Sequence, residues 1–486
     1  MTPPHAVERR VSAAALRRTL GAPATGGSAY LALADGLRRA VLDGSLPLAT
    51  RLPSERELAD VLGVSRTTTA AAYQRLREQG FLATRRGSGS VTTLPSGPRR
   101  PDGGLTMPRD GAPAVVDLSV AAPPAPPELA GAAARALEAL PRLLGTTGYT
   151  HLGLAELRHE VAARYARRGT PTAPDEVLVT TGAQQALNLL VSTMVGPGDR
   201  VVVEHPAYPN VLTAIRAAGG RPVPVPVGAD GLDLDLLEST VRQVSPRLVH
   251  LTPDHHNPTG TSLDDEGRAR VRELAARHRT LVVADETLTD LTLDGPEPSS
   301  ITGDATRSGL VAVGSASKSF WGGLRVGWVR GHRDVVGRLA TGRAHHDIST
   351  AVLDQLVVAE LLARADEILP ARRARVRDQR DVLLAAVARK LPWLVPVPAG
   401  GLSAWADLGA PVSSALAALA VRHGVRVAPG PVFGVDGSFE HRLRLPFSLP
   451  PEEIERGVAA LAEAWRALGV DGAPAAPSPA PAAAVV

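Results

Sequence analysis

The feature that most constrains the fold is an alternation that runs from about residue 115 to about residue 469. Short segments rich in valine or leucine recur along this stretch, and helix-like segments lie between them. The clearest strand-like segments are Glu176–Thr181, Arg200–Glu204, Leu248–Thr252, Thr280–Ala284 and Leu310–Gly314. Because strands that alternate with helices pair as parallel neighbours, we expect residues 114–469 to form an α/β domain with a mostly parallel sheet.

The first hundred residues differ from this body in their charge. They contain 15 arginines and 7 acidic residues, a net charge of +8, whereas the rest of the chain has 38 basic and 42 acidic side chains, a net charge of −4. A basic module joined to a slightly acidic body suggests a nucleic-acid-binding domain fused to a domain of another kind.

Residues 28–94 contain the start and stop signals of several short helices. Leu37 and Val41 are four residues apart, as on one face of a helix. Ser54 is followed three residues later by Glu57, which is the capping box with which a second helix begins. We therefore expect residues 28–94 to fold as a compact, largely helical domain.

A tight turn at Gly63 separates this second helix from a third, which Ser65 caps. The first turn of the third helix carries Arg66 and a run of threonines. A short helix, a tight turn and a helix that presents arginine and threonine form the helix-turn-helix layout. Two strand-like segments, Phe81–Thr84 and Ser90–Thr93, then flank two arginines and two glycines, which predicts a β-hairpin wing suited to the phosphate backbone.

This module resembles the winged helix-turn-helix domain of GntR-type bacterial transcription regulators. The stretches RLPSERELADVLGVSRTTTAAAYQRL and GFLATRRGSGS carry the resemblance and cover essentially the whole module. The resemblance implies that the module binds double-stranded operator DNA. The residues that it places at the DNA are Arg51, Arg56, Ser65, Arg66, Thr67 and Thr68 on the helical part, and Arg85, Arg86 and Gly87 in the wing. Which of them contact bases rather than phosphates stays open.

Composition excludes several other kinds of site. The chain has no cysteine, so it has no disulfide, no thiolate metal site and no cysteine nucleophile. No stretch reaches about 18 apolar residues and the N-terminus has no apolar signal segment, so we expect neither secretion nor a membrane span. We also expect no metal site. Residues 95–113 are rich in proline and glycine and predict a linker, and residues 470–486 predict a disordered Ala/Pro tail.

Polar residues follow the predicted strands of the body, where α/β sheets bind ligands. The turn Thr181–Gln185 opens an apolar helix, and the backbone N–H groups of Ala183 and Gln184 there are placed to bind a phosphate. Tyr208 is one of only five tyrosines and is a candidate to stack on a ring. Asn257, in an Asn-Pro-Thr-Gly loop, is a candidate donor to a phenolic oxygen. Each of these signals is weak when taken alone.

Two further groups complete the pattern. Asp285 directly follows the fourth strand-like segment, where a carboxylate can pair with a protonated ring nitrogen. Ser315, Ser317 and Arg325 can hold a phosphate dianion. Lys318 is one of only two lysines among 53 basic residues, and its amine, unlike a guanidinium, can attack a carbonyl to form a Schiff base. A phosphate cradle, a stacking ring, a phenolate donor, an acid and an amine together describe one ligand, pyridoxal 5′-phosphate (PLP).

The order and spacing of these groups resemble the fold-type I aminotransferases of class I and II, over about residues 116–468. The resemblance implies that Lys318 carries PLP and that a smaller C-terminal α+β subdomain follows the main sheet. It also implies that Arg444 binds the carboxylate of a substrate or effector and that Tyr149 reaches into the site of the partner subunit. Arg442 is a weaker candidate for the carboxylate.

One residue departs from the family pattern. The family usually has a tyrosine two residues after the aspartate, bonded to the phenolic oxygen of the cofactor, but this chain has Thr287. Threonine is too short to replace that phenol, so we expect cofactor binding to persist while catalysis weakens. His256 stands just before Asn257, where related regulators often have glutamine.

The combination of both modules resembles the MocR/GabR class of regulators. This resemblance implies a cytoplasmic, domain-swapped homodimer in which the aminotransferase-like body senses a small amino compound. Two alternatives stay open at this point. The chain could be an active aminotransferase with a fused DNA-binding module, or a regulator for which PLP itself is the signal.

Overall fold

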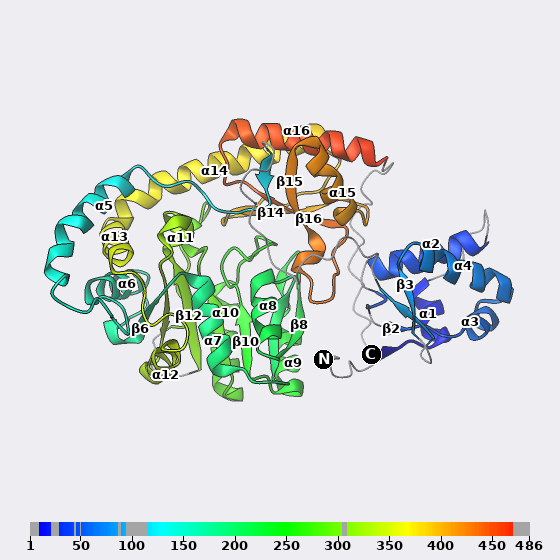
Figure 1. Ribbon diagram of the computed structural model, residues 1–486, viewed down its shortest axis with the longest axis horizontal. Coiled ribbons are helices and arrows are strands. Elements are labelled where there is room, and N and C mark those ends of the chain that lie inside the picture. The colour runs from blue at the N-terminus through cyan, green and yellow to red at the C-terminus, as the bar shows by residue number, and fades with distance from the viewer. Residues whose placement is uncertain are drawn as a thin grey trace.

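The computed structural model describes residues 9–20, 29–42, 45–48, 50–85, 89–93, 115–303 and 309–469. A small N-terminal unit and a large unit that follows it occupy these ranges (Figure 1). The whole predicted linker, residues 95–113, and the whole predicted tail, residues 470–486, lie outside the described residues. Among the described residues, no helix is both long and apolar enough to cross a lipid bilayer.

The N-terminal unit is a winged helix. Its helices are α1 (Ala13–Leu20), α2 (Ala29–Leu42), α3 (Glu55–Leu62) and α4 (Arg66–Glu78), and its strands are β1 (Arg9–Arg10), β2 (Thr50–Arg51), β3 (Leu82–Arg85) and β4 (Gly89–Thr92). The strands form one sheet in the order β1-β2-β4-β3, and the antiparallel pair of β3 and β4 forms the arms of the wing. Leu37, Leu58 and Tyr73 pack in its apolar core.

The helix-turn-helix has the caps that the sequence predicts. The Ser54 hydroxyl accepts a hydrogen bond from the Glu57 N–H, and the Glu57 carboxylate accepts one from the Ser54 N–H at 2.8 Å. Gly63 ends α3 in the left-handed region, at φ 66°. Ser65 starts α4 by accepting from the Thr68 N–H at 3.0 Å. These local bonds fix where α3 ends and α4 begins, and so fix the direction in which α4 projects.

The large unit is built on an eight-stranded sheet in the order β6-β13-β12-β11-β10-β7-β8-β9. Its strands are β6 (Val177–Thr180), β7 (Arg200–His205), β8 (Arg221–Gly228), β9 (Gly231–Leu232), β10 (Leu248–Leu251), β11 (Leu281–Asp285), β12 (Leu310–Ser315) and β13 (Gly327–Gly331). Only β13 and β9 run against their neighbours, so the sheet is mostly parallel, as predicted.

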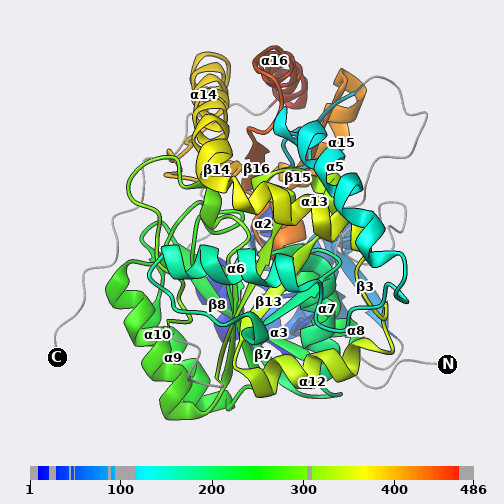
Figure 2. The same cartoon turned by 90° about the vertical axis from the view of Figure 1, so that its left-hand side faces the viewer.

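Helices cover both faces of this sheet (Figure 2). They are α5 (Glu128–Ala139), α6 (Ala155–Arg167), α7 (Ala183–Met194), α8 (Pro209–Ala217), α9 (Leu234–Val244), α10 (Asp265–His278), α11 (Ala316–Ser319), α12 (Arg333–Arg343) and α13 (Val352–Ala363). Val201 and Val203 pack with α7, α8 and α12, whereas Val202 packs with α9 and α10 on the other face. Successive strand residues point to opposite faces, so a run of valines fills both cores.

A smaller subdomain carries a second sheet in the order β14-β16-β15-β5. Its elements are β5 (Val116–Leu118), α14 (Ala365–Lys390), β14 (Ser403–Asp407), α15 (Ser413–Ala420), β15 (Val425–Pro429), β16 (Arg442–Pro446) and α16 (Pro451–Leu468). Short 3₁₀ helices lie in both parts of the large unit. In the part with the main sheet they are Leu140–Leu143, Pro174–Glu176, Thr289–Leu291 and Gly322–Leu324, and in the smaller subdomain they are Val421–His423 and Gly430–Phe433. The subdomain is α+β, as the resemblance implies, although β5 comes from the start of the large unit.

Candidate functional site

Lys318 lies on α11, directly after the end of β12. Ser315 starts this helix, because its hydroxyl accepts a hydrogen bond from the Ser317 N–H at 3.1 Å. The Lys318 amine donates to the carbonyl of Ala121 at 2.7 Å. Burial, and after it the positive charge of Arg444, lowers the pKa of this amine to about 8. The neutral, nucleophilic form is therefore well populated just above neutral pH.

The predicted phosphate groups come together at the N-terminus of α7. A Cβ added at Gly182, which has φ 81°, would stand 2.7 Å from Arg325 Nη2, so glycine is required for this close approach. A Cβ at Gly327 would stand 2.7 Å from the backbone nitrogen of Ala183. Arg325 Nη1 lies 3.5 Å from Ser317 Oγ. A helix N-terminus, a hydroxyl and a guanidinium thus converge, and this donor set fits a phosphate dianion.

Tyr208 immediately precedes α8, next to the N-terminus of α7. Its hydroxyl donates to Gln184 Oε1 at 3.1 Å and accepts from Asn210 Nδ2 at 2.9 Å. Burial, and after it the negative charge of Asp285, raises the pKa of the Tyr208 phenol. Asp285 itself is buried at the end of β11, and its Oδ1 accepts from the Thr287 N–H at 3.0 Å. Tyr208, the predicted ring platform, and Asp285, the predicted acid, therefore lie close enough for their charges to interact.

Arg444, on β16, is a buried cation at this region. Its guanidinium donates to the carbonyl of Ser119 and, at 3.4 Å, to Asn257 Oδ1, and it lies 5.0 Å above the centre of the Phe433 ring. Among the described residues no carboxylate forms an ion pair with it, and burial lowers its pKa to about 10. A buried guanidinium without an anion fits an incoming carboxylate. The contact also leaves the amide NH₂ of Asn257 available to donate.

Arg442 does not share this position. It is two residues earlier on β16, half-buried, and its Nη2 lies 3.1 Å from Asp407 Oδ2. That ion pair occupies the guanidinium, so Arg444 is the candidate for the carboxylate.

Tyr149 lies in the loop that precedes α6. Its side chain is 65% exposed, and no described side chain of the same chain bonds to its hydroxyl. The structure of one chain therefore places this predicted residue on the surface. A role in the site of a partner subunit stays a prediction.

Thr287 lines a cavity of about 20 Å³ together with Glu286, Ser315 and Tyr165. The Tyr165 hydroxyl, at the same cavity, accepts a hydrogen bond from Trp328 Nε1 at 3.4 Å. A space of this size is enough for about one water molecule. The groups that fit the phosphate, the ring and the ring nitrogen of PLP are thus present, while one donor to its phenolic oxygen is missing.

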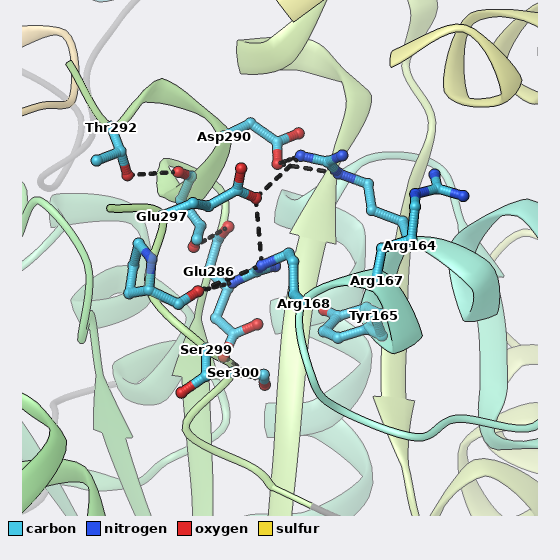
Figure 3. Close-up of polar contacts among 12 residues, drawn as sticks. Arg164, Tyr165, Arg167, Arg168, Glu286, Asp290, Thr292, Glu297, Ser299 and Ser300 are labelled. Carbon is cyan, nitrogen blue, oxygen red and sulfur yellow. Dashed lines mark hydrogen bonds and ion pairs between the residues drawn. The ribbon is translucent and has the colours of Figure 1, made fainter. Parts of the chain in front are cut away.

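The sequence shows no sign of a buried ionic network that Arg164 forms with Asp290 and Glu297 (Figure 3). Arg164 Nε donates to Asp290 Oδ1 at 3.0 Å, and Arg164 Nη2 lies 3.1 Å from Glu297 Oε1. Asp290 Oδ2 accepts from the hydroxyl of Ser319, the residue after Lys318, at 2.7 Å. The network holds the end of α11 to α6. Its members are far apart in sequence, so no local pattern could have shown it.

Two histidines are buried near these residues: His256, which the sequence singled out as a departure from related regulators, and His250, which it did not. His256 Nε2 lies 3.3 Å from Glu204 Oε2, and His250 is buried in the middle of β10. Burial lowers the pKa of His250, against the charges of Asp285 and Glu204. A histidine inside the apolar run Leu-Val-His-Leu was the available signal. Among the described residues, no three acidic or histidine side chains are grouped to hold a metal ion.

The predicted DNA-facing residues of the winged helix are described in part. Arg56 and Arg66 are exposed and form no ion pair within the described part of the chain. The Ser65 hydroxyl lies 2.7 Å from those of Thr67 and Thr68. Arg51 reaches toward the base of the wing, 3.5 Å from a Cβ built on Gly89. The side chain of Arg85, and Arg86 and Gly87, lie outside the described residues.

The fold and these donor groups define a PLP-dependent aminotransferase-like domain of fold type I joined to a winged helix. The chain belongs to the class I and II aminotransferase family, whose model matches residues 114–461, and residues 29–91 match the gntR family of bacterial regulatory proteins. This pairing of a gntR module with an aminotransferase-like body is that of the MocR-type transcription regulators.

Individual relatives fall into both groups. The chain is 33% identical to 2-aminoadipate transaminase of Thermus thermophilus over 68% of this chain and 86% of that protein. It is 27% identical to the HTH-type transcriptional regulator YisV of Bacillus subtilis over 88% and 94%, and 29% identical to the probable rhizopine catabolism regulatory protein MocR of Rhizobium meliloti over 74% and 78%. The match to the regulator YisV includes the winged helix as well as the body.

Among solved structures, the fold matches LysN, the α-aminoadipate aminotransferase of Thermus thermophilus, in complex with N-(5′-phosphopyridoxyl)-L-leucine. The two chains are 31% identical, with a TM-score of 0.67, over 73% of this chain and 93% of LysN. That structure holds a PLP derivative in the same fold, which agrees with the donor set described above.

Proposed function

We propose that this regulator senses a small amino compound that carries a carboxylate, and that it passes the signal from the PLP site to the winged helix. The observation that carries the proposal is Arg444. It is a buried guanidinium without a carboxylate partner among the described residues, and its charge acts on the Lys318 amine.

The residues of the chain divide the work of binding in a simple way. Arg325, Ser317 and the N-terminus of α7 would hold the phosphate of PLP, and Asp285 would keep its ring nitrogen protonated. When bound, PLP would supply an electrophilic carbonyl carbon for the Lys318 amine or for the amine of a ligand. Arg444 would then orient that ligand by its carboxylate, as a charge-assisted pair in a water-poor site.

Weak turnover is part of the proposal. Asn257 can donate to the phenolic oxygen of the ring, but Thr287 is too short to add the second hydrogen bond of the family pattern. Less stabilisation of negative charge on that oxygen makes repeated proton transfer at the ligand slower. Binding survives, since the phosphate contacts lie elsewhere in the site. These properties suit a sensor better than a metabolic enzyme.

A homodimer is the proposed assembly. Several large apolar side chains are exposed around α5, the adjoining 3₁₀ helix and α13, which lie side by side in Figure 2. They are Leu137, Leu144, Tyr149, Ile348 and Leu353. A surface of this kind marks a protein contact. We further propose that the dimer is domain-swapped and cytoplasmic, with each winged helix placed against the body of the other chain.

Two other functions have some support. Lys318, Asp285, Arg325 and Arg444 are all present, which favours an active aminotransferase as the second candidate. A regulator that responds to PLP itself would need the same cofactor contacts but no free carboxylate site.

Titration of the PLP-loaded protein separates these possibilities. Amino acids and carboxylate-free amines are added in parallel, and absorbance in the visible range and formation of keto acid are followed together. We expect amino acids to change the spectrum at lower concentration than matched amines, with little keto acid. Many turnovers per second would support the enzyme instead, and no spectral response to any amine would support sensing of PLP.

A further inference from the structure

A concave surface lies at the N-terminal ends of central strands of the main sheet, away from the PLP site. A depression of about 640 Å³ lies where β11 and β12 begin, whereas Asp285 and Ser315 mark the other ends of these strands. At about 3.3 Å per residue, the length of β11 separates the two places by roughly 13 Å. Helices α10 and α12 flank this end of the sheet on opposite sides (Figure 2).

Four arginines line this depression, which we call the arginine pocket. They are Arg247 before β10, Arg272 on α10, Arg279 at its end and Arg338 on α12. None of them forms an ion pair within the described part of the chain. Two of them donate to backbone carbonyls instead, Arg247 Nε to Met194 at 2.8 Å and Arg272 Nη1 to Ile301 at 3.5 Å.

Other arginines of the same helix are not left without partners. On α10, Arg270 pairs with Asp235 and Arg277 pairs with Glu238. The carboxylates of α9 thus neutralise one face of α10, while the face toward the pocket keeps its positive charge. Four guanidinium groups that have no carboxylate partners among the described residues and share one concave surface favour the binding of an anion there.

Apart from Thr280, the rest of the lining is apolar or glycine. Leu310 and Ala275 are buried side chains at its floor, Leu281 beside them is partly buried, and Met194 and Val335 complete the apolar part. A volume of this size falls in the range of small-molecule sites, about 300–1,000 Å³. Guanidinium groups beside an apolar floor match a compound that has both a multiply charged anionic group and an organic part.

We propose that the arginine pocket is a second binding site, for a phosphorylated small molecule, separate from the PLP site. Phosphate is the best match because four forked guanidinium groups can satisfy several oxygens of one dianion or trianion. The phosphate backbone of DNA has the same charge, but a long duplex would use an extended basic track and would leave the apolar floor unused.

Pyrophosphate is the probe that tests the pocket. The full chain is first loaded with PLP and reduced with borohydride, so that the PLP phosphate site is filled and cannot bind the probe. Isothermal titration at low salt then compares wild type with the double variant Arg279→Ala/Arg338→Ala. Removing two of four charged donors should weaken binding roughly tenfold or more.

The matched control is Arg242→Ala/Arg422→Ala, which removes the same charge from two exposed positions outside the pocket. It should bind pyrophosphate like wild type. Equal affinity in the pocket variant, or no binding by wild type, would overturn the proposal. All three proteins are also titrated with a non-operator duplex at several salt concentrations. A salt dependence reduced only in the pocket variant, without pyrophosphate binding, would make the surface a DNA contact and also overturn it.

Discussion

At the scale of single residues, the site depends on a lysine and an arginine that share a buried region. The positive charge of Arg444 and burial both lower the pKa of Lys318, to about 8. The amine is therefore protonated and inert below that pH and becomes nucleophilic as the pH rises through it.

This relation predicts a pH dependence of cofactor attachment. The rate at which PLP joins the apoprotein should rise with pH, with a midpoint at about pH 8, and level off above it. In Arg444→Gln the midpoint should move to higher pH, because the charge that lowers the pKa of Lys318 is gone. Stopped-flow absorbance measures the rate, and borohydride followed by peptide mapping locates the adduct. Lys390→Ala, at the other lysine of the chain, is the control. An adduct on Lys390, or an unchanged midpoint, would contradict the assignment.

Thr287 gives a second prediction at this scale. Thr287→Tyr should restore a phenol donor to the ring oxygen, shift the visible absorbance of the PLP-loaded protein and raise transaminase turnover by about tenfold, the typical effect of one added charge-stabilising hydrogen bond. Thr287→Val, which keeps the size of threonine, should leave the spectrum near that of wild type. If tyrosine and valine give the same spectrum, the missing phenol is not what limits this site.

At the scale of elements, the approach of β13 to the N-terminus of α7 sets the phosphate cradle. A Cβ on Gly327 would lie 2.7 Å from the Ala183 nitrogen and 2.8 Å from the Gly314 oxygen, so backbone must move. Gly327→Ala should therefore raise the Kd for PLP by about tenfold or more, as equilibrium dialysis can measure. Gly337→Ala is the control, since a Cβ there meets nothing within 4 Å. Equal affinity in both variants would show that the close approach is unimportant.

The winged helix gives a prediction at the same scale. Arg66 is exposed on the first turn of α4 and forms no ion pair within the described residues. If it reads a base, Arg66→Ala should cost about 1–3 kcal/mol at the cognate site and relax specificity. Arg85→Ala, in the wing, should weaken binding to all sequences and reduce the salt dependence. Fluorescence anisotropy with operator and scrambled duplexes compares them. Operator affinity unchanged in Arg66→Ala would remove this residue from the interface.

Local features of these elements could be predicted from the sequence because their causes are local. The capping box of Ser54 and the left-handed Gly63 act within four residues, and the valine-rich segments mark five strands of the main sheet. Strand β8 was missed because it contains three prolines. It tolerates them near the edge of the sheet, where its partner β9 is only two residues long.

Long-range features could not be predicted in this way. The contact of Arg164 with Asp290 joins residues 126 positions apart. The choice between Arg442 and Arg444 needs the surroundings of β16, which pair Arg442 with Asp407 and leave Arg444 facing the site. Recognition of the family supplied Arg444 and Tyr149, whereas the residues alone supplied the lysine and the phosphate cradle.

At the scale of the whole molecule, regulation by a ligand requires that the PLP site and the DNA-binding surface be coupled. A ligand of the PLP site controls DNA binding only if it binds two arrangements of the winged helices with different affinity. The same coupling must operate in both directions, so operator DNA should also change the affinity for the amino compound by the same factor.

The most direct test measures both sites in one sample. PLP-loaded wild type is titrated with an amino acid that changes its absorbance, while anisotropy reports its affinity for a labelled duplex from the flank of its own gene. We expect absorbance and DNA affinity to change over the same range of amino acid concentration, and we expect Lys318→Ala to lose both responses. DNA affinity that stays constant while the spectrum changes, or that changes equally in Lys318→Ala, would contradict this coupling.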